Sequence, residues 1–153
     1  MSFASRVKIV EVGPRDGLQN EPETIATEDK IQFVNLLTEA GLPHLEVTSF
    51  VSPRWVPQLA DCVEVFEAVE KRQGIEYSAL VPNMYGFERA LGAGVRRIAI
   101  FTAASETFNQ HNINASIDES LERFAPVMER AKAEGVWVRG YVSTSFGCPY
   151  DGD

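Results

Sequence analysis

The sequence predicts an α/β fold built on a parallel sheet. Short apolar runs rich in β-branched residues alternate along the whole chain with longer segments whose apolar residues recur at helical spacing. Each strand–helix unit takes roughly 20–40 residues, which is the length that a parallel crossover requires. Periodicity alone does not separate an open sheet from an incomplete barrel. The strands are expected at residues 7–12, 45–50, 76–81, 97–101 and 136–142.

The first strand–helix unit has clear boundaries. Residues 7–12 are mostly β-branched and stop at Gly13-Pro14, which predicts a buried strand followed by a turn. Thr27 can cap the next helix, and Gly41 is placed to end it.

The second and third units follow the same logic. The strand at 45–50 is apolar except for Glu46, and a proline-rich loop follows it. Asp61 resembles an N-terminal cap for a second helix that closes at Gly74. The strand at 76–81 then ends at a Pro-Asn turn.

The second half of the chain is expected to hold two more helices. A short one is predicted at 85–93, before the fourth strand. A polar loop with His111 follows that strand, and a lone loop histidine is more often solvated than a ligand. Ser116 and Glu119 fit a capping box, which predicts a helix over 117–134.

Composition narrows the class of protein. The 153 residues allow one ordinary domain with a core. The net charge of −8 argues against nucleic acid as a partner, since phosphates favour a basic surface. No run approaches the ~20 apolar residues of a membrane helix, and no presequence is visible, so a cytoplasmic protein is expected; the alternative is one already stripped of a transit peptide. Cys62 and Cys148 lie far apart and are expected to be free thiols.

A charged cluster follows the first strand directly. Asp16 offers a hard oxygen ligand for Mg²⁺ or Mn²⁺, and Arg15 offers a permanent cation for a carbonyl, enolate or carboxylate oxygen. The alternative is an ordinary Asp-Gly turn with an Arg–Asp surface pair. If Glu46 points inward from the second strand it needs a partner, and Arg15 is the candidate. If that strand is an edge strand, Glu46 faces water instead.

These residues also carry a family resemblance. Gly-Pro-Arg-Asp-Gly-Leu-Gln-Asn-Glu at 13–21 resembles the first-strand motif of the 3-hydroxy-3-methylglutaryl-CoA lyase family. Arg-Asp-Gly-x-Gln alone is shared with isopropylmalate and homocitrate synthases, whereas the flanking Gly-Pro and Asn-Glu point to the lyase branch. Similar motifs follow in family order at 46–53, 55–58, 101–106 and 138–143.

The resemblance implies a parallel (β/α)₈ TIM barrel. A whole barrel needs ~200 residues or more, so residues 1–153 are expected to form the N-terminal part of one catalytic domain, with about five β/α units. The 153-residue chain is therefore expected to be a fragment of such an enzyme or a truncated product.

The implied reaction is the retro-Claisen cleavage of 3-hydroxy-3-methylglutaryl-CoA to acetyl-CoA and acetoacetate, as in leucine degradation. In this family a divalent metal chelates the substrate, and an arginine stabilises the enolate. By resemblance, Arg15 and Glu46 are the catalytic residues, with Glu46 holding Arg15, and Asp16 is the Mg²⁺ or Mn²⁺ ligand. Arg15, Gln19 and Ser49 would line the acyl-CoA substrate, and the full-length enzyme would be a homodimer.

The resemblance also shows what this chain lacks. The family completes its metal site with two histidines and an asparagine from later strands, and its catalytic cysteine lies in a later glycine-rich loop. Cys148 follows the fifth strand and matches a different family segment, so we do not assign it that role. We therefore expect the 153-residue chain alone to be inactive. Two alternatives remain: an acyl-CoA/2-oxo acid condensing enzyme of the isopropylmalate synthase type, and a non-catalytic half-barrel that self-associates.

Overall fold

The fold is a curved parallel sheet with helices along one face. The computed structural model describes residues 4–152. Its four strands lie in the order β1-β2-β3-β4, and every pair of neighbours is parallel. In chain order they are β1 (His44–Ser49), β2 (Glu76–Leu80), β3 (Arg97–Ala103) and β4 (Trp137–Ser143).

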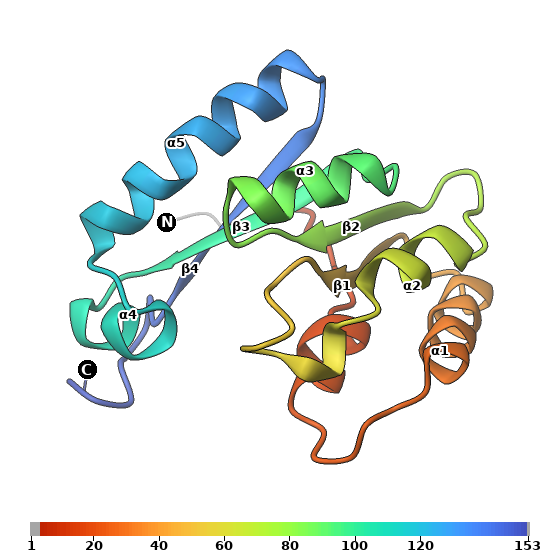
Figure 1. Cartoon of the computed structure of the whole chain (residues 1–153), viewed down its shortest axis with the longest axis horizontal. Helices are drawn as coiled ribbons and strands as arrows, with labels where there is room; N and C mark the ends of the chain where they lie inside the picture. Colours follow the sequence, from red (N-terminus) through yellow and green to blue (C-terminus); the bar gives the residue numbers. More distant parts are fainter. Residues whose placement is uncertain (1–3, 153) are drawn as a thin grey trace.

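Helices connect the strands as crossovers (Figure 1). α1 and α2 pack together and against β1, whereas α5 packs against α3, β3 and β4. No helix in the part of the chain that the structure describes is long and apolar enough to cross a membrane. The helical elements are the π-helical turn η1 (Gly13–Gly17), α1 (Thr27–Glu39), the 3₁₀ turn η2 (Pro57–Leu59), α2 (Cys62–Ala68), α3 (Met84–Gly92), α4 (Glu106–Ile113) and α5 (Ile117–Ala133).

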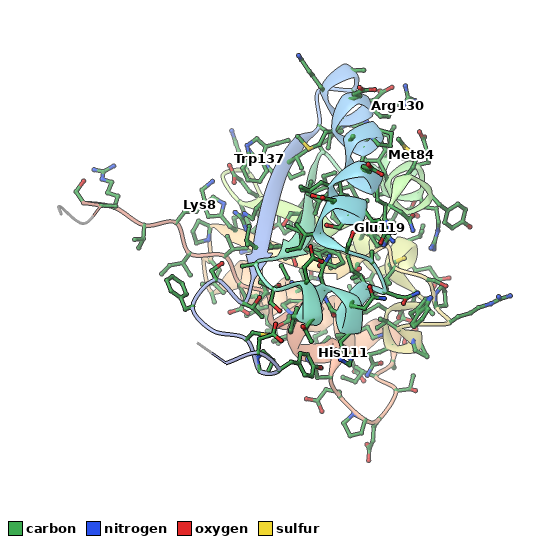
Figure 2. The ribbon with its side chains drawn as sticks, turned by 90° about the vertical axis from the view of Figure 1, so that its left-hand side faces the viewer. Lys8, Met84, His111, Glu119, Arg130 and Trp137 are labelled. Carbon is green, nitrogen blue, oxygen red and sulfur yellow. The ribbon has the colours of Figure 1, made fainter. Side chains whose placement is uncertain are left out.

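The hydrophobic core lies between the sheet and these helices. Each strand sends alternate apolar side chains toward the helices, and each helix returns one apolar stripe. Among the largest fully buried side chains are Phe50, Phe66, Phe87, Leu45 and Ile98. The opposite face, which we call the inner face, carries Trp137 on β4. Figure 2 shows Lys8 and Trp137 on one side of β4 and the α5 residues Glu119 and Arg130 on the other.

Most predicted elements are confirmed to within a few residues. The strands at 45–50, 76–81, 97–101 and 136–142 correspond to β1 to β4. The capping box of α5 is also present: the backbone N–H of Glu119 donates to Ser116 Oγ at 3.1 Å, and that of Ser116 donates to Glu119 Oε2 at 2.8 Å.

The predicted first strand at 7–12 is wrong in extent. Only Glu11 bridges to β1, through N–H donation from Glu11 to the carbonyl of His44 at 2.9 Å and from Glu46 to the carbonyl of Glu11 at 2.8 Å. Val7 and Ile9 are 82% and 67% exposed instead of buried. The segment has β1 as a neighbour on one side, and no second ladder among residues 4–152 holds it extended.

The predicted Thr27 cap is wrong, and Asp61 occupies the predicted N-cap position of α2 without making a side-chain capping bond. Thr27 lies inside the first turn of α1, and Asp61 makes no capping bond to α2, which ends at Ala68 rather than near Gly74. Asp61 instead binds Lys30, which is only 4% exposed, and Thr27 donates to Asp61. Asp61 accepts from Lys30 Nζ at 2.9 Å and from Thr27 Oγ1 at 2.8 Å. A buried ammonium needs an anion more than a helix end needs a cap.

The predicted polar loop around His111 is also wrong. These residues form α4, which Ser105 caps by accepting from the backbone N–H of Phe108 at 3.0 Å. His111 is exposed to solvent, as predicted, although its ring also stacks on Tyr150 with the centroids 4.4 Å apart.

Candidate active site

The turn η1, which follows residues 7–12, positions Arg15 and Asp16. The backbone N–H groups of both residues donate to the carbonyl of Val12, at 3.0 and 2.7 Å, and close η1. Glu11 Oε1 accepts from the N–H of Gly13 at 2.6 Å. A Cβ at Gly13 would lie 2.8 Å from that carboxylate oxygen, so any larger residue would displace the Glu11 side chain from this bond. The predicted cluster therefore sits in a tightly hydrogen-bonded backbone.

Glu46 points inward and binds Arg15. Its Oε1 accepts from Arg15 Nε at 2.6 Å, and Glu46 is completely buried. The Arg15 side chain is 13% exposed. The predicted pairing is confirmed, and the alternative in which Glu46 faces water on an edge strand is wrong. Because the guanidinium has five N–H donors and the two carboxylates occupy two of them, donors remain for a ligand.

Tyr141 and Arg139 extend this pair across the inner face. The Tyr141 hydroxyl donates to Glu46 Oε2 at 2.9 Å and lies 3.3 Å from Arg139 Nη1, which donates to it. Burial raises the pKa of the Tyr141 phenol, and Glu46 acts in the same direction. The phenol therefore stays protonated and both oxygens of Glu46 are hydrogen-bonded. We call Arg15, Glu46, Tyr141 and Arg139 the inner network.

No role for Tyr141 or Arg139 was predicted from the sequence. One available signal was the alternation of β4, which places residues 137, 139 and 141 on one face. The partner across the sheet could not be found this way, because Glu46 lies 95 residues earlier.

Asp16 is exposed and paired with Arg15. Its Oδ1 accepts from Arg15 Nη1 at 2.7 Å, and its side chain is 56% exposed. Among residues 4–152 no group of three or more histidine, cysteine, aspartate or glutamate side chains is arranged to hold a metal ion. The described residues therefore do not by themselves fit a Mg²⁺ or Mn²⁺ site.

Ser49 has a buried hydroxyl without a partner. It lies at the carboxyl end of β1 and is completely buried, yet its Oγ makes no hydrogen bond. A buried hydroxyl usually finds a partner, so an unpaired one at a strand end needs an explanation. It is free to bind a ligand atom there.

Gln19 lies in a separate groove. With Trp55 and Gln58 it lines a hollow of ≈ 290 Å³ that none of Arg15, Asp16 or Glu46 lines. Gln58 holds one wall by accepting from the N–H of Ile25 at 3.0 Å and donating to the carbonyl of Glu23 at 2.7 Å. Gln19 therefore lines this groove and is not part of the inner network.

The two cysteines are free thiols, as expected. Burial raises the pKa of the Cys62 thiol, which makes it a weak nucleophile. Cys148 Sγ contacts Ser105 Oγ at 3.1 Å and has no bond to the inner network.

Residues 6–153 match the family model described as HMGL-like. The chain is 57% identical over 153 residues to the 3-hydroxy-3-isohexenylglutaryl-CoA/hydroxy-methylglutaryl-CoA lyase of Pseudomonas aeruginosa, covering 100% of this chain and 51% of that protein. It is 55% identical over 152 residues to the mitochondrial hydroxymethylglutaryl-CoA lyase of Gallus gallus, covering 99% and 51%. It is also 55% identical over 146 residues to the cytoplasmic 3-hydroxy-3-methylglutaryl-CoA lyase of Danio rerio, covering 95% and 44%.

The fold agrees with these matches. The crystal structure of hydroxymethylglutaryl-CoA lyase from P. aeruginosa superposes with a TM-score of 0.94, covering 100% of this chain and 51% of that one. The parallel sheet and its helices are thus part of a TIM barrel, as the resemblance implies. The chain spans about half the length of the curated relatives it matches. On the match over residues 6–153, this chain belongs to the HMGL-like family.

Proposed function

We propose that residues 1–153 are the N-terminal part of one TIM-barrel domain with hydroxymethylglutaryl-CoA lyase activity, and that they supply its enolate-stabilising cation. The reaction is the cleavage of 3-hydroxy-3-methylglutaryl-CoA to acetyl-CoA and acetoacetate, a step of leucine degradation. The observation that supports this is the bond between Arg15 and the completely buried Glu46. The names of the relatives supply the substrate class.

The cleavage requires a cation held in place beside the thioester oxygen, where negative charge develops. Removal of the proton from the tertiary hydroxyl breaks the neighbouring C–C bond, and the electron pair collects on the thioester enolate of acetyl-CoA. Arg15 has N–H donors left after it binds Glu46 and Asp16. A guanidinium already held in place stabilises the enolate oxygen without reorganising during the step.

The other residues position Arg15 and the substrate. Glu46 and Tyr141 orient the guanidinium through the 2.6 Å and 2.9 Å bonds. The free hydroxyl of Ser49 would bind a polar atom of the acyl group. Gln19 would contact the acyl-CoA from its groove.

A divalent metal, Mg²⁺ or Mn²⁺, remains part of the proposal, with Asp16 as the ligand that this chain offers. Such an ion takes several oxygen ligands, and Asp16 is one. Further ligands would come from outside the described residues.

The homodimer and the cytoplasmic location also remain predictions. The D. rerio relative is named cytoplasmic and the G. gallus relative mitochondrial.

The test compares acetoacetate release by this chain alone with acetoacetate release by this chain together with the second half of a related barrel. We expect the 153-residue chain alone, with Mg²⁺ or Mn²⁺, to release no acetoacetate from the substrate. Co-expressed with the part of the P. aeruginosa lyase that this chain does not match, it should release acetoacetate. Arg15→Met should lower that rate by about 10²–10³-fold, the usual effect of removing one such donor.

A matched control is Arg130→Met on α5, where the side chain is 44% exposed and bound to Glu88 and Glu134. It should leave the rate unchanged. Turnover by the chain alone, or an Arg15→Met rate equal to the control, would contradict the proposal. Consumption of acetyl-CoA with a 2-oxo acid would favour the condensing enzyme instead.

A further inference from the structure

A buried glutamine holds the loop that leads into α1. Residues 18–26 run from η1 to the start of α1 and carry Gln19 near their beginning (Figure 1). Gln58, in the 3₁₀ turn η2, is 8% exposed. Its Oε1 accepts from the backbone N–H of Ile25 at 3.0 Å, and its Nε2 donates to the carbonyl of Glu23 at 2.7 Å. Both hydrogen bonds join the loop before α1 to the loop after β1.

This loop has few other attachments. Within residues 4–152, the stretch 22–25 makes no backbone–backbone hydrogen bond. The two bonds from Gln58 therefore satisfy backbone groups that a sheet ladder or helix would otherwise satisfy. At the other end of the loop, Asn20 Nδ2 donates to the carbonyl of Asp16 at 2.7 Å. The loop is thus tied to η1 at one end and to Gln58 at the other.

Lys30 fixes the position of Gln58. Lys30 is 4% exposed, and its ammonium donates to the carbonyl of Gln58 and to both carboxylate oxygens of Asp61, at 2.9 Å each for the carboxylate. These three acceptors match the three N–H donors of an ammonium. An ammonium is stable away from water only when such bonds are made. Gln58 is therefore attached to a buried and fully bonded charge.

This network fastens an exposed loop rather than a part of the core. The side chains of residues 21–24 are exposed, so a fixed conformation of this loop contributes little apolar burial. Loops of this kind, positioned by a rigid scaffold, are where proteins place their binding residues. Gln19 and Trp55 line the groove of ≈ 290 Å³, and Gln58 lines it as well. The residue that holds the loop thus also forms part of the groove.

We infer that Gln58 is a positioning residue for substrate binding, because it holds residues 18–25 where Gln19 meets the acyl-CoA. The inference rests on the proposed function for the identity of that substrate. Arg15 is held separately, since its guanidinium is bonded to the buried Glu46 of β1. Loss of the Gln58 amide should therefore weaken substrate binding and leave the cleavage step almost as fast.

Hydrogen exchange tests the positioning without substrate. Gln58→Met keeps the volume of the side chain and removes both hydrogen bonds. In the 153-residue chain, the backbone N–H of Ile25 should then exchange about tenfold faster, a factor equivalent to about 1.4 kcal/mol. Gln58→Glu keeps an acceptor for this N–H, so it should retain most of the protection. Circular dichroism of each variant reports folding.

The matched control is Gln73→Met. Gln73 is exposed in the turn before β2, and its side chain makes no hydrogen bond to another residue of the described range 4–152. The same substitution at this position should leave exchange at Ile25 unchanged.

Steady-state kinetics supply the second readout. The chain is co-expressed with the part of the P. aeruginosa lyase that it does not match. Gln58→Met should raise the KM for 3-hydroxy-3-methylglutaryl-CoA about tenfold and change kcat by less than about twofold. Gln58→Glu should give an intermediate KM. A merely structural role would instead reduce the amount of folded enzyme and so lower the apparent kcat at an unchanged KM.

Two results would overturn the inference. In the first, Ile25 exchanges at the same rate in Gln58→Met and in Gln73→Met. In the second, Gln58→Met lowers kcat and leaves KM unchanged. Absence of turnover with Gln58 intact would count against the proposed function instead, and exchange at Ile25 would then decide the inference alone.

Discussion

Replacing Glu46 with glutamine should destabilise the chain by about 3 kcal/mol, the low end of the range for removing one partner of a buried ion pair. Glu46 is completely buried and accepts from Arg15 and Tyr141. Glutamine keeps the volume, but its NH₂ group must then face one of these two donors. The low end applies because Arg15 keeps its bond to Asp16 and is 13% exposed.

A double-mutant cycle isolates the pair. Arg15→Gln, Glu46→Gln and the double variant are compared by urea unfolding, monitored by circular dichroism at pH 7. We expect a coupling energy of about 1.5–3 kcal/mol, the value of a hydrogen bond to a charged group. Glu39→Gln, which breaks a 3.5 Å surface pair with Arg72, should cost less than about 1 kcal/mol. If the two single substitutions change the free energy of unfolding additively, the side chains are not coupled and the reasoning is refuted.

Three further predictions concern other polar groups. Asp61→Asn should cost about 3–5 kcal/mol in urea unfolding, because Lys30 is 4% exposed and would lose its anion; a cost below that of Glu39→Gln would contradict it. Lys8, then Arg97 and His44, hold the pKa of Glu76 below its ordinary 4.5, so the folded chain should lose stability as the pH falls below 4.5 through the lowered pKa. Glu76→Gln should flatten that acid limb of the stability profile, and an unchanged acid limb would count against the ion cluster. Ser49→Ala should change stability by no more than about 0.5 kcal/mol because its hydroxyl has no partner, whereas Ser78→Ala, which removes a 3.2 Å bond to the carbonyl of Leu45, should cost about 0.5–1.5 kcal/mol; equal costs would mean that Ser49 is bonded.

The sequence predicted the elements whose signals are local. The repeating strand–helix pattern fixed the parallel sheet, and Ser116 with Glu119 fixed the start of α5. A carboxylate inside an apolar strand requires a nearby cation if it points inward, and this requirement predicted the Arg15–Glu46 pair.

Elements that depend on distant neighbours were missed. Residues 7–12 have strand composition, but a strand also needs ladders, and this segment makes one bridge. Asp61 lies at the predicted N-cap position of α2, but its carboxylate binds a buried lysine 31 residues away instead of the helix end. Tyr141 reaches Glu46 through the curvature of the sheet, which no local pattern encodes. What the sequence lacks in these cases is the identity of the partner, not the chemistry of the residue.

The central claim is that buried Glu46 fixes the Arg15 guanidinium, and the most direct measurement is hydrogen exchange at Arg15 Nε. In ¹H–¹⁵N spectra at pH 7 the Nε–H of Arg15 should be visible and exchange much more slowly than that of Arg54, which is exposed. In Glu46→Gln the protection should disappear. An Arg15 Nε–H that exchanges as fast as that of Arg54 in the unmodified chain would contradict the account.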